Sequence, residues 1–471
     1  MHYLKNFIDG APVRPETPEF RDVIAPYTGE VIAKVPVGSV ADVGAAVRSA
    51  AKAQPGWASL SVADRLGHLR GAAHVLRSHV RELAELESRE MGKPVPLAEQ
   101  IVSAAINGLL SSTDQAESYP FIADVSAPGE TSCTVVERKP RGVVALVVPW
   151  NFTVSSILGP LGPLLAAGNT VVVKPSEKAP LSASRLAELL GLPPGVVCLV
   201  HGDARAGAPL VDHELIALAH FTGSVEVGRS VSVAAARRLQ RSVLELGGND
   251  PVIVDAGVDV VATAKAVAMS SFINSGQICT SSERVFVHRE VAEDFVRELV
   301  AAAESYPMVS AADHAGLGPM VDDAQRNTVH AHVTDAVARG ATVRCGGEIP
   351  DRPGFFYPAT VLTGVTPEMR IMQEETFGPV APVIVVASFD EALALANGTS
   401  FGLAATVYSH DERNLRRCAE LNAAIVWINE WQGGGVNMVY EPWGLSGVGI
   451  TGGAASFDAA TRPVSIVTPL A

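Results

Sequence analysis

From residue 142 onward, short apolar runs alternate with stretches that have a helical pattern. The runs are too uniformly apolar for strands with one face in water, which indicates parallel sheets covered by helices on both faces. The first set of runs is GVVALVVPW, NTVVVKPSE, VVCLVHGD, ALAHFTGS and SVLELGG, and the second set is DPVIVD, RVFVH, APVIVVAS, LAATVYS and AIVWIN. Helices are expected within the second set at roughly 291–304, 324–339 and 412–422. The predicted fold class is therefore α/β, with two sheets.

The N-terminal part carries the pattern of one long amphipathic helix between residues 57 and 94. Apolar residues recur there at steps of three and four, and Gly92 and Pro94 are expected to end the helix. The apolar stripe comprises Leu66, Leu69, Ala73, Leu76, Val80 and Leu83. A chain of 471 residues also exceeds the ~250–300 residues that one hydrophobic core supports, so we expect two or more domains.

Two alternating, β-branched segments fit neither set of strands, at residues 131–140 and 461–470. They either pair as a protruding sheet that binds another subunit or form a simple edge hairpin. The sequence alone leaves both interpretations open.

The chain is acidic, with a formal net charge of −14 and an isoelectric point near 5.4. This charge argues against nucleic acid and anionic membranes as partners, because both require a basic surface. No run reaches the ~20 apolar residues of a membrane span, and the first residues, MHYLKNFIDG, lack the pattern of a secretion signal. We therefore expect a cytoplasmic protein.

The five cysteines are scattered, without a CxxC pair or a histidine at metal-ligand spacing. They are Cys133, Cys198, Cys279, Cys345 and Cys418. An odd and sparse set predicts reduced thiols and argues against both a disulfide framework and a metal site. One of the thiols is then a candidate nucleophile.

Three polar residues follow apolar segments: Cys279 in FINSGQICTS, Glu245 in LELGG, and Asn151 after GVVALVV. Taken singly, a buried cysteine is usually a small hydrophobe, and an asparagine after a strand is usually a turn residue. A carboxylate at a strand end is either a surface residue or a base in a partly desolvated pocket. Ligands of open α/β sheets bind at the carboxyl ends of the strands, so each residue also has a chemical interpretation.

Six motifs in this order resemble the aldehyde dehydrogenase superfamily over nearly the whole chain. They are PWNF at 149–152, KPSE at 174–177, FTGSVEVG at 221–228, LELGG at 244–248, GQICTS at 276–281 and EETFGP at 374–379. The resemblance implies an aldehyde dehydrogenase-like α/β fold, with two Rossmann-like parallel-sheet domains and a small β element for oligomerisation. The implied boundaries are an NAD-binding domain at 1–119 and 141–247, a catalytic domain at 248–440, and the β element at 120–140 and 458–471.

By this resemblance the chain oxidises an aldehyde to a carboxylic acid on Cys279. The thiolate would attack the aldehyde carbon, while the amide of Asn151 and the N–H of Cys279 would bind the oxyanion. Hydride transfer to NAD would leave a thioester, and Glu245 would activate the water that hydrolyses it.

The resemblance also implies a site for NAD, with NADP as a poorer cofactor. Lys174 and Glu177 would lie at the adenosine ribose, where the carboxylate accepts from a 2′-hydroxyl and repels a 2′-phosphate. Ser224 would meet the pyrophosphate at a helix N-terminus, and Glu375 would hold the nicotinamide ribose. The whole implied set is Trp150, Lys174, Ser176, Glu177, Thr222, Gly223, Ser224, Gly228, Leu246, Gly247, Glu375 and Phe377.

Three departures from the family pattern concern water activation and substrate access. Asn249 stands where a lysine usually follows LELGG, Pro160 stands where many relatives carry a basic residue, and the loop at 442–451 is shortened. Small residues where relatives often carry bulky ones predict a roomy funnel for a medium-sized aromatic or aliphatic aldehyde. The residues expected to line it are Phe152, Ser155, Ser156, Gly159, Ile278 and Thr280.

Gly159 also narrows the substrate class. By the resemblance, it removes a basic side chain used for short dicarboxylic semialdehydes and an aromatic side chain used for quaternary ammonium aldehydes. Both classes are therefore disfavoured, with Trp431 and Trp443 as the remaining candidates for aromatic walls.

Other functions stay open from the sequence. One alternative is a dehydrogenase that transfers the acyl group to CoA rather than to water, but Glu245 favours water. Another is a catalytically retired family member with a structural or binding role, which would be expected to lose a catalytic residue. A papain-like thiol hydrolase would need a histidine partner, and His220 is favoured as a strand-end residue. The expected partners are a small-molecule aldehyde and further copies of the chain, in a homodimer or homotetramer.

Overall fold

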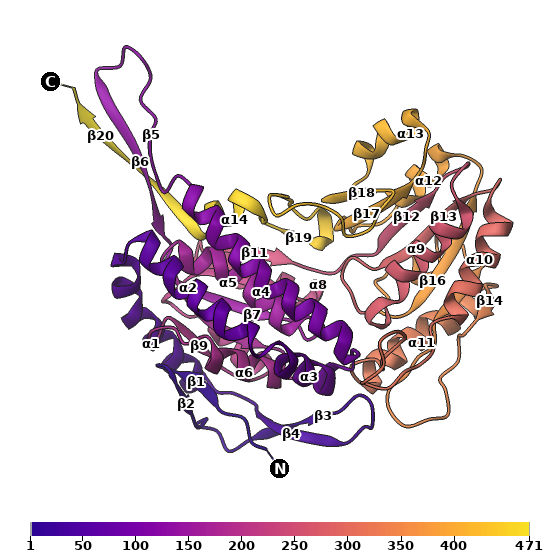
Figure 1. Cartoon of the computed structure of the whole chain (residues 1–471), viewed down its shortest axis with the longest axis horizontal. Helices are drawn as coiled ribbons and strands as arrows, with labels where there is room; N and C mark the ends of the chain where they lie inside the picture. Colours follow the sequence, from indigo (N-terminus) through magenta and orange to yellow (C-terminus); the bar gives the residue numbers. More distant parts are fainter. Residues whose placement is uncertain (1, 471) are drawn as a thin grey trace.

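The computed structural model describes residues 2–470 as two α/β halves and a narrow projecting sheet. Figure 1 shows the first half in indigo to magenta, the second half mainly in orange, and the projecting sheet extending away from the first half. The predicted α/β class with two parallel sheets is confirmed. The exact domain boundaries stay a prediction.

The first sheet has eight strands, in the order β19-β11-β10-β7-β8-β9-β1-β2. Its five central strands are the first predicted set and run parallel, whereas the outer strands run antiparallel to their neighbours. The strands are β7 (Val143–Val148), β8 (Thr170–Pro175), β9 (Val197–Leu199), β10 (Ile216–Thr222), β11 (Arg241–Glu245), β1 (Asn6–Ile8), β2 (Ala11–Val13) and β19 (Gly447–Val448). The chain order reverses between β7 and β10, and ligands of open α/β sheets bind at the carboxyl ends beside such a switch point.

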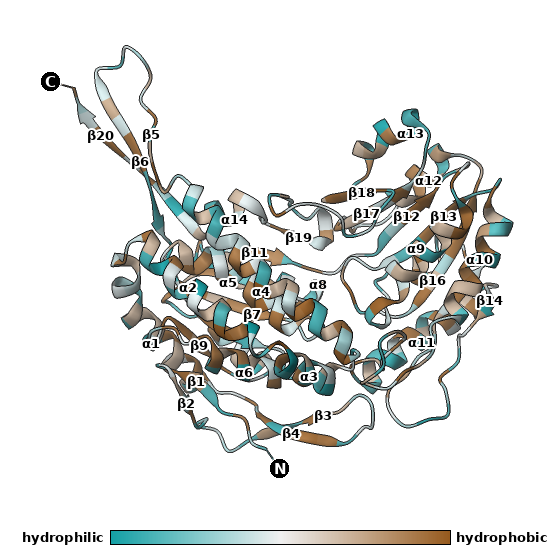
Figure 2. Ribbon diagram, viewed as in Figure 1, coloured by the Kyte–Doolittle hydropathy of each residue, from teal (hydrophilic) through white to brown (hydrophobic). Residues whose placement is uncertain are grey.

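Helices cover both faces of the first sheet, and Figure 2 shows its central strands as mostly hydrophobic. On one face lie α2 (Val62–Arg77), α3 (Val80–Met91), α4 (Val95–Ser118), α5 (Thr153–Ala166), α6 (Leu181–Leu189) and α14 (Gly453–Ala460). On the other lie α1 (Val40–Ser59), α7 (Ala204–Val211) and α8 (Val225–Arg237). Within residues 2–470, no helix combines the length and the apolar composition needed to cross a membrane.

The prediction of one helix across residues 57–94 is wrong, because this part holds the end of α1 and the separate helices α2 and α3. Ser61 caps the start of α2, and a turn at 78–79 separates α2 from α3. Both helices pack on the same core, so the apolar stripe continues across the turn and its spacing does not reveal the break. Gly92 does end α3, in the left-handed conformation with φ of 94°.

The second sheet has seven strands, in the order β14-β15-β16-β13-β12-β17-β18. The second predicted set forms parallel strands, and only the edge strand β14 runs antiparallel. The strands are β12 (Asp250–Val254), β13 (Ser282–His288), β14 (Thr342–Cys345), β15 (Thr360–Thr363), β16 (Val380–Val386), β17 (Ala404–Tyr408) and β18 (Ile425–Ile428). One face packs on α9 (Val260–Phe272) and α10 (Ala292–Glu304), and the other packs on α11 (Asp323–Ala338) and α12 (Phe389–Ala396). The helix expected at 412–422 is shorter, since α13 (Glu412–Arg416) passes into a 3₁₀ turn.

The two unassigned segments pair with each other in the projecting sheet. Strand β20 (Thr461–Pro469) runs antiparallel to β6 (Ser132–Pro140), and β5 (Ile122–Asp124) pairs with the other edge of β6. Apolar side chains such as Val467 are exposed on this sheet. Its use in a homodimer or homotetramer stays a prediction. A separate hairpin, β3 (Phe20–Ile24) with β4 (Val31–Pro36), lies near the N-terminus.

Asn169 connects α5, β7 and the end of α14 through its buried side chain. Its Oδ1 accepts from the N–H groups of Arg141 at 2.8 Å and Gly142 at 3.0 Å. Its Nδ2 donates to the carbonyl oxygens of Leu164 and Ala460, both at 2.9 Å. One amide therefore satisfies four backbone groups from distant parts of the chain.

Replacing this amide tests how strongly it holds the first half together. We expect Asn169→Ala to lower the free energy of unfolding by about 3 kcal/mol or more, because each buried polar group without a partner costs ~1–3 kcal/mol. Urea denaturation followed by circular dichroism measures the change. Asn327→Ala, at an exposed asparagine bonded to Asp323, is the control and should change stability by less than about 0.5 kcal/mol. Equal losses in the two variants would contradict the connecting role of Asn169.

Candidate active site

Cys279 follows a loop whose backbone contains three consecutive residues in the left-handed region. Asn274, Ser275 and Gly276 have φ angles of 53°, 56° and 69°. A Cβ at Gly276 would lie 2.1 Å from the carbonyl oxygen of Gly378, so only glycine permits this close approach. Strained backbone of this kind persists only where the surrounding contacts fix it, and it gathers at functional sites.

Asn151 reaches this loop from the end of β7. Its Nδ2 donates to the carbonyl oxygen of Gln277 at 3.1 Å. Gln277 is itself buried and fixed, because its Oε1 accepts from the N–H of Val321 at 2.9 Å. The N–H of Cys279 lies against its own sulfur and favours the thiolate. The Asn151 amide is therefore held at the backbone two residues before Cys279, and the oxyanion roles of the two donors stay a prediction.

A buried ion pair supports the segment that carries Asn151. Lys93 Nζ lies 2.8 Å from a carboxylate oxygen of Glu87, and neither side chain is exposed. The other oxygen of Glu87 accepts from the N–H of Val154 at 2.8 Å, at the start of α5. Lys93 Nζ also lies 4.4 Å from the ring centre of Phe152, within the range of a cation–π contact. No role for Glu87 or Lys93 was predicted from the sequence.

Glu245 ends β11, in register with Thr222 on β10. Burial raises the pKa of the Glu245 carboxyl to about 8, because the ionised form loses its hydration. Its buried Oε1 has no hydrogen-bond partner among the described residues. A carboxyl in this state can accept a proton near neutral pH, which a general base requires.

The surroundings of Cys279 favour its protonated thiol. Burial, and after it the carboxyl groups of Asp250, Glu375 and Glu245 in that order, raise its pKa to about 12. A thiolate is the reactive nucleophile, so attack requires a base that removes the proton. Glu245 lines the same cavity as the thiol and can serve as that base.

This cavity has a volume of about 420 Å³ and lies where α4, α5, β10 and β11 face the cysteine loop. It contains Ser156, Gly159 and Thr280 from the predicted funnel. Three further residues expected to line the funnel are absent from its wall, namely Phe152, Ser155 and Ile278. Phe152 packs on Lys93, as described above, and Ile278 is buried in the loop. Thr222 and Leu246, which were assigned to the cofactor, also line this cavity.

Several wall residues were not identified from the sequence. Gly108, Ser111, Ser112 and Gln115 come from one face of α4, at steps of three and four, so their spacing was a usable signal. Tyr440 comes from the loop before β19, and no pattern in the sequence marks it. Burial raises the pKa of its phenol, and the nearby Glu245 and Cys279 raise it further.

The residues of the EETFGP motif form a second surface beside Cys279. The rings of Trp150 and Phe377 meet edge to face, with centres 5.5 Å apart. Glu375 accepts from the N–H of Gly248 at 3.1 Å, and a Cβ at Gly247 would lie 2.1 Å from the Glu375 carboxylate. Gly247 and Gly248 therefore allow the Glu375 carboxylate to approach the end of β11. The predicted role of Glu375 at the nicotinamide ribose needs a carboxylate at this strand end.

Asn249 supports this motif, in place of the lysine that usually follows LELGG. Its Nδ2 donates to Glu283 at 3.0 Å and to the carbonyl oxygen of Glu374 at 3.1 Å. Glu283 in turn accepts from the N–H groups of Thr376 at 2.9 Å and Phe377 at 2.7 Å. Asn249 thus holds the loop of the EETFGP motif and makes no hydrogen bond to Glu245. The role of Glu283 was not predicted from the sequence.

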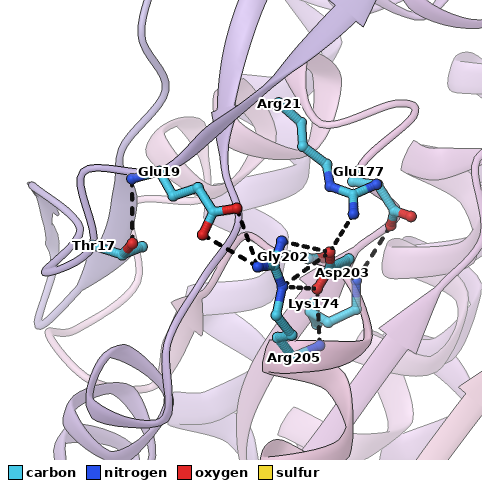
Figure 3. Close-up of polar contacts among 8 residues, drawn as sticks. All are labelled: Thr17, Glu19, Arg21, Lys174, Glu177, Gly202, Asp203 and Arg205. Carbon is cyan, nitrogen blue, oxygen red and sulfur yellow. Dashed lines mark hydrogen bonds and ion pairs between the residues drawn. The ribbon is translucent and has the colours of Figure 1, made fainter.

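Lys174, the penultimate residue of β8, and Glu177, just after the strand, lie together in the polar cluster of Figure 3. Lys174 Nζ donates to the carbonyl oxygens of Gly202 at 2.6 Å and Pro175 at 2.8 Å, and lies 3.9 Å from the carboxylate of Glu177. Burial lowers the pKa of Lys174. Glu177 remains partly exposed, so its carboxylate can accept from a ribose hydroxyl. Ser176 accepts from the N–H of Lys178 at 3.3 Å and shapes the turn between them.

The N-terminus of α8 offers backbone donors beside the same strand ends. Ser224 is its N-cap, and its hydroxyl makes no capping hydrogen bond. A Cβ at Gly228 would lie 2.4 Å from Leu246, and a Cβ at Gly223 would lie 2.6 Å from the ring of Phe221. Glycine at these positions keeps the helix close to the sheet, and a helix N-terminus with free donors fits a pyrophosphate. The donors and acceptors of this region therefore fit NAD.

Comparisons with known proteins agree with this arrangement. The model of the aldehyde dehydrogenase family matches residues 13–466. A betaine aldehyde dehydrogenase from Cereibacter sphaeroides is 37% identical over 469 residues, which cover 98% of this chain and 96% of that protein. The solved NAD-dependent aldehyde dehydrogenase from Sinorhizobium meliloti has a TM-score of 0.96 and 32% identity, and the match covers 99% of this chain and 95% of that one. An indole-3-acetaldehyde dehydrogenase solved with NAD⁺ has the same score and identity, over 99% and 97% of the two chains.

The carboxylate of Glu177 leads to a prediction about cofactor choice. Glu177→Gln should raise kcat/KM with NADP relative to NAD by about tenfold, because a like-charge contact costs ~1–4 kcal/mol at 4 Å. Steady-state absorbance of the reduced cofactor measures both ratios. Glu412→Gln, at a carboxylate that is 82% exposed on α13, is the matched control. An unchanged ratio in Glu177→Gln would contradict the ribose assignment.

Proposed function

Because this chain belongs to the aldehyde dehydrogenase family and oxidises aldehydes with NAD, we propose that the reaction proceeds through a thioester on Cys279 that water hydrolyses. One observation carries the proposal. Cys279 and Glu245 face a single cavity, while the amide of Asn151 is bonded to the backbone two residues before the cysteine. Nucleophile, base and oxyanion donor thus come together from three distant segments of the chain.

The first step needs the proton of the buried thiol to leave. Glu245 is the only carboxyl group among the described residues that line the cavity, so it is our candidate for the base. The sulfur of Cys279 then attacks the aldehyde carbon. The amide of Asn151 and the N–H of Cys279 would stabilise the oxyanion of the adduct, and one such donor is typically worth ~3 kcal/mol. NAD⁺, when bound, supplies the acceptor for the hydride that leaves the adduct.

The second step removes the acyl group. Glu245 takes a proton from water, the resulting hydroxide attacks the thioester carbon, and the carbon–sulfur bond breaks. The products are the carboxylic acid and the thiolate of Cys279. Since burial raises the pKa of Glu245 to about 8, the fraction of the basic form rises with pH through that value.

Two variants test these steps. Cys279→Ala should lower activity by at least about a thousandfold, because no other group in the wall can form the adduct. Glu245→Gln should lower both the rate of the first NADH turnover and the steady turnover by about a hundredfold or more, because it removes the base of both steps. In the unaltered enzyme, the rate of thioester hydrolysis should rise with pH up to about 8, the pKa of Glu245. Full activity in Cys279→Ala would refute the mechanism.

The CoA-dependent alternative is tested in the same assay. NADH formation without CoA should equal that with CoA, because Glu245 favours water as the acceptor. Strict dependence on CoA would show that the acyl group is not transferred to water.

We further propose that the substrate is an uncharged aldehyde of medium size. A quaternary ammonium group is recognised by a cage of Trp, Tyr or Phe rings, whereas Tyr440 is the only residue of these three types among the described residues that line the cavity. An added Cβ at Gly159 would have no atom within 4 Å, so this wall is open. The alternative aromatic walls are absent from the cavity: Trp431 donates to the carbonyl oxygen of Thr280 at 2.9 Å, and Trp443 is 59% exposed.

A pair of isosteric substrates tests this choice. Betaine aldehyde and 3,3-dimethylbutanal have the same shape and differ by one positive charge. We expect kcat/KM to be at least about tenfold higher for the neutral compound, which corresponds to 1.4 kcal/mol. A preference for betaine aldehyde would overturn the proposed substrate class, while leaving the thioester mechanism untouched.

A further inference from the structure

His220 is a titratable residue in the wall of the catalytic cavity that the mechanism above does not use. It lies inside β10, two residues before Thr222, and both side chains face the cavity. The sequence favoured a strand-end residue for His220, but the strand continues to Thr222. Since Thr222 is in register with Glu245, His220 lies deeper along the sheet by about 7 Å, the rise of two strand residues.

Two buried polar side-chain atoms in the cavity wall have no hydrogen-bond partner among the described residues, Oε1 of Glu245 and Nδ1 of His220. The side chain of His220 is 92% buried, as its exposed fraction is 8%. By contrast, Gln115 donates to the carbonyl oxygen of Val436 at 2.6 Å, and Ser112 donates to that of Gly108 at 3.1 Å. A buried polar atom without a partner is costly unless a water or a ligand meets it.

The titratable side chains that share the wall with His220 are Glu245, Cys279 and Tyr440. The lining residues of α4, α5, β18 and α14 are uncharged, as is Leu403 just before β17. In particular, α5 contributes Pro160, which cannot carry a proton. The described wall therefore offers one neutral base, His220, within reach of the carboxyl that accepts a proton from water. Burial lowers the pKa of its imidazole to about 4, so the ring is uncharged at rest.

We propose that His220 relays protons between Glu245 and solvent through water in the cavity. This inference rests on the proposed function of Glu245 in thioester hydrolysis. After Glu245 has taken a proton from the attacking water, its O–H donates that proton to an intervening water, which passes one of its own protons to the imidazole. The imidazolium, disfavoured by burial, releases a proton toward the surface. No electrons are transferred, and Glu245 returns to its basic form.

The cavity provides the path that this relay needs. His220 and Glu245 lie about 7 Å apart in level along the sheet, and no hydrogen bond joins their unpartnered side-chain atoms, so the proposed contact runs through water. The wall also includes Val436 and Ile450, which are 62% and 45% exposed. The cavity therefore extends from the buried carboxyl to the surface of the molecule.

The experiment isolates thioester hydrolysis. Enzyme, NAD⁺ and 3,3-dimethylbutanal are mixed, the reaction is stopped at intervals, and intact mass reports the decay of the acyl-enzyme, while NADH absorbance reports its formation. The variants are His220→Gln, which keeps a polar side chain but cannot relay a proton in this way, and His220→Ala with added imidazole. His288→Gln, at a half-buried histidine that ends β13 outside the cavity wall, is the matched control.

We expect His220→Gln to slow the decay of the acyl-enzyme by about tenfold or more, with an unchanged burst of NADH. Imidazole should restore the decay rate of His220→Ala in proportion to its concentration, and His288→Gln should behave as the unaltered enzyme. Unchanged decay in His220→Gln, or an equal loss of burst and decay without rescue by imidazole, would overturn the relay. Absence of any acyl-enzyme in the unaltered protein would instead refute the proposed function, so the two failures are distinguishable.

Discussion

The hydrogen bond from the Asn151 amide to the carbonyl oxygen of Gln277 joins the two halves of the molecule beside Cys279. The rest of the site depends on this contact, because a donor from the first half must meet an oxyanion formed on a loop of the second. The structure fixes both ends. The buried pair of Glu87 and Lys93 supports the segment of Asn151, and buried hydrogen bonds hold Gln277.

Burial around this contact determines the chemistry. It raises the pKa of Glu245 to about 8 and that of Cys279 to about 12. Both shifts favour the protonated forms, so each step requires a proton to leave the site. The site must therefore remove protons from Cys279 and Glu245, and this requirement is the main physical constraint on its chemistry. His220 lines the same cavity and is the neutral base that we propose for this proton movement.

The sequence predicted the parts of the fold whose signals are local. Strands buried on both faces are continuous apolar runs, so the central strands of both sheets were identified, and the motifs placed Cys279, Glu245 and Asn151 at the ends of such elements. The break at 78–79 was missed because the apolar stripe passes through the turn in phase. Contacts between distant segments also left no local pattern. Asn249 with Glu283 is one such contact, and the approach of Tyr440 to the cavity is another.

The most direct test of this account is peptide mass mapping of the trapped acyl-enzyme. The unaltered enzyme is mixed with NAD⁺ and an aldehyde, quenched in acid within the first turnover and digested. The account predicts that the peptide containing Cys279 gains the mass of one acyl group, that hydroxylamine removes this mass, and that the other four cysteines remain unmodified. An adduct on another cysteine, or NADH formation with no thioester on Cys279, would contradict it.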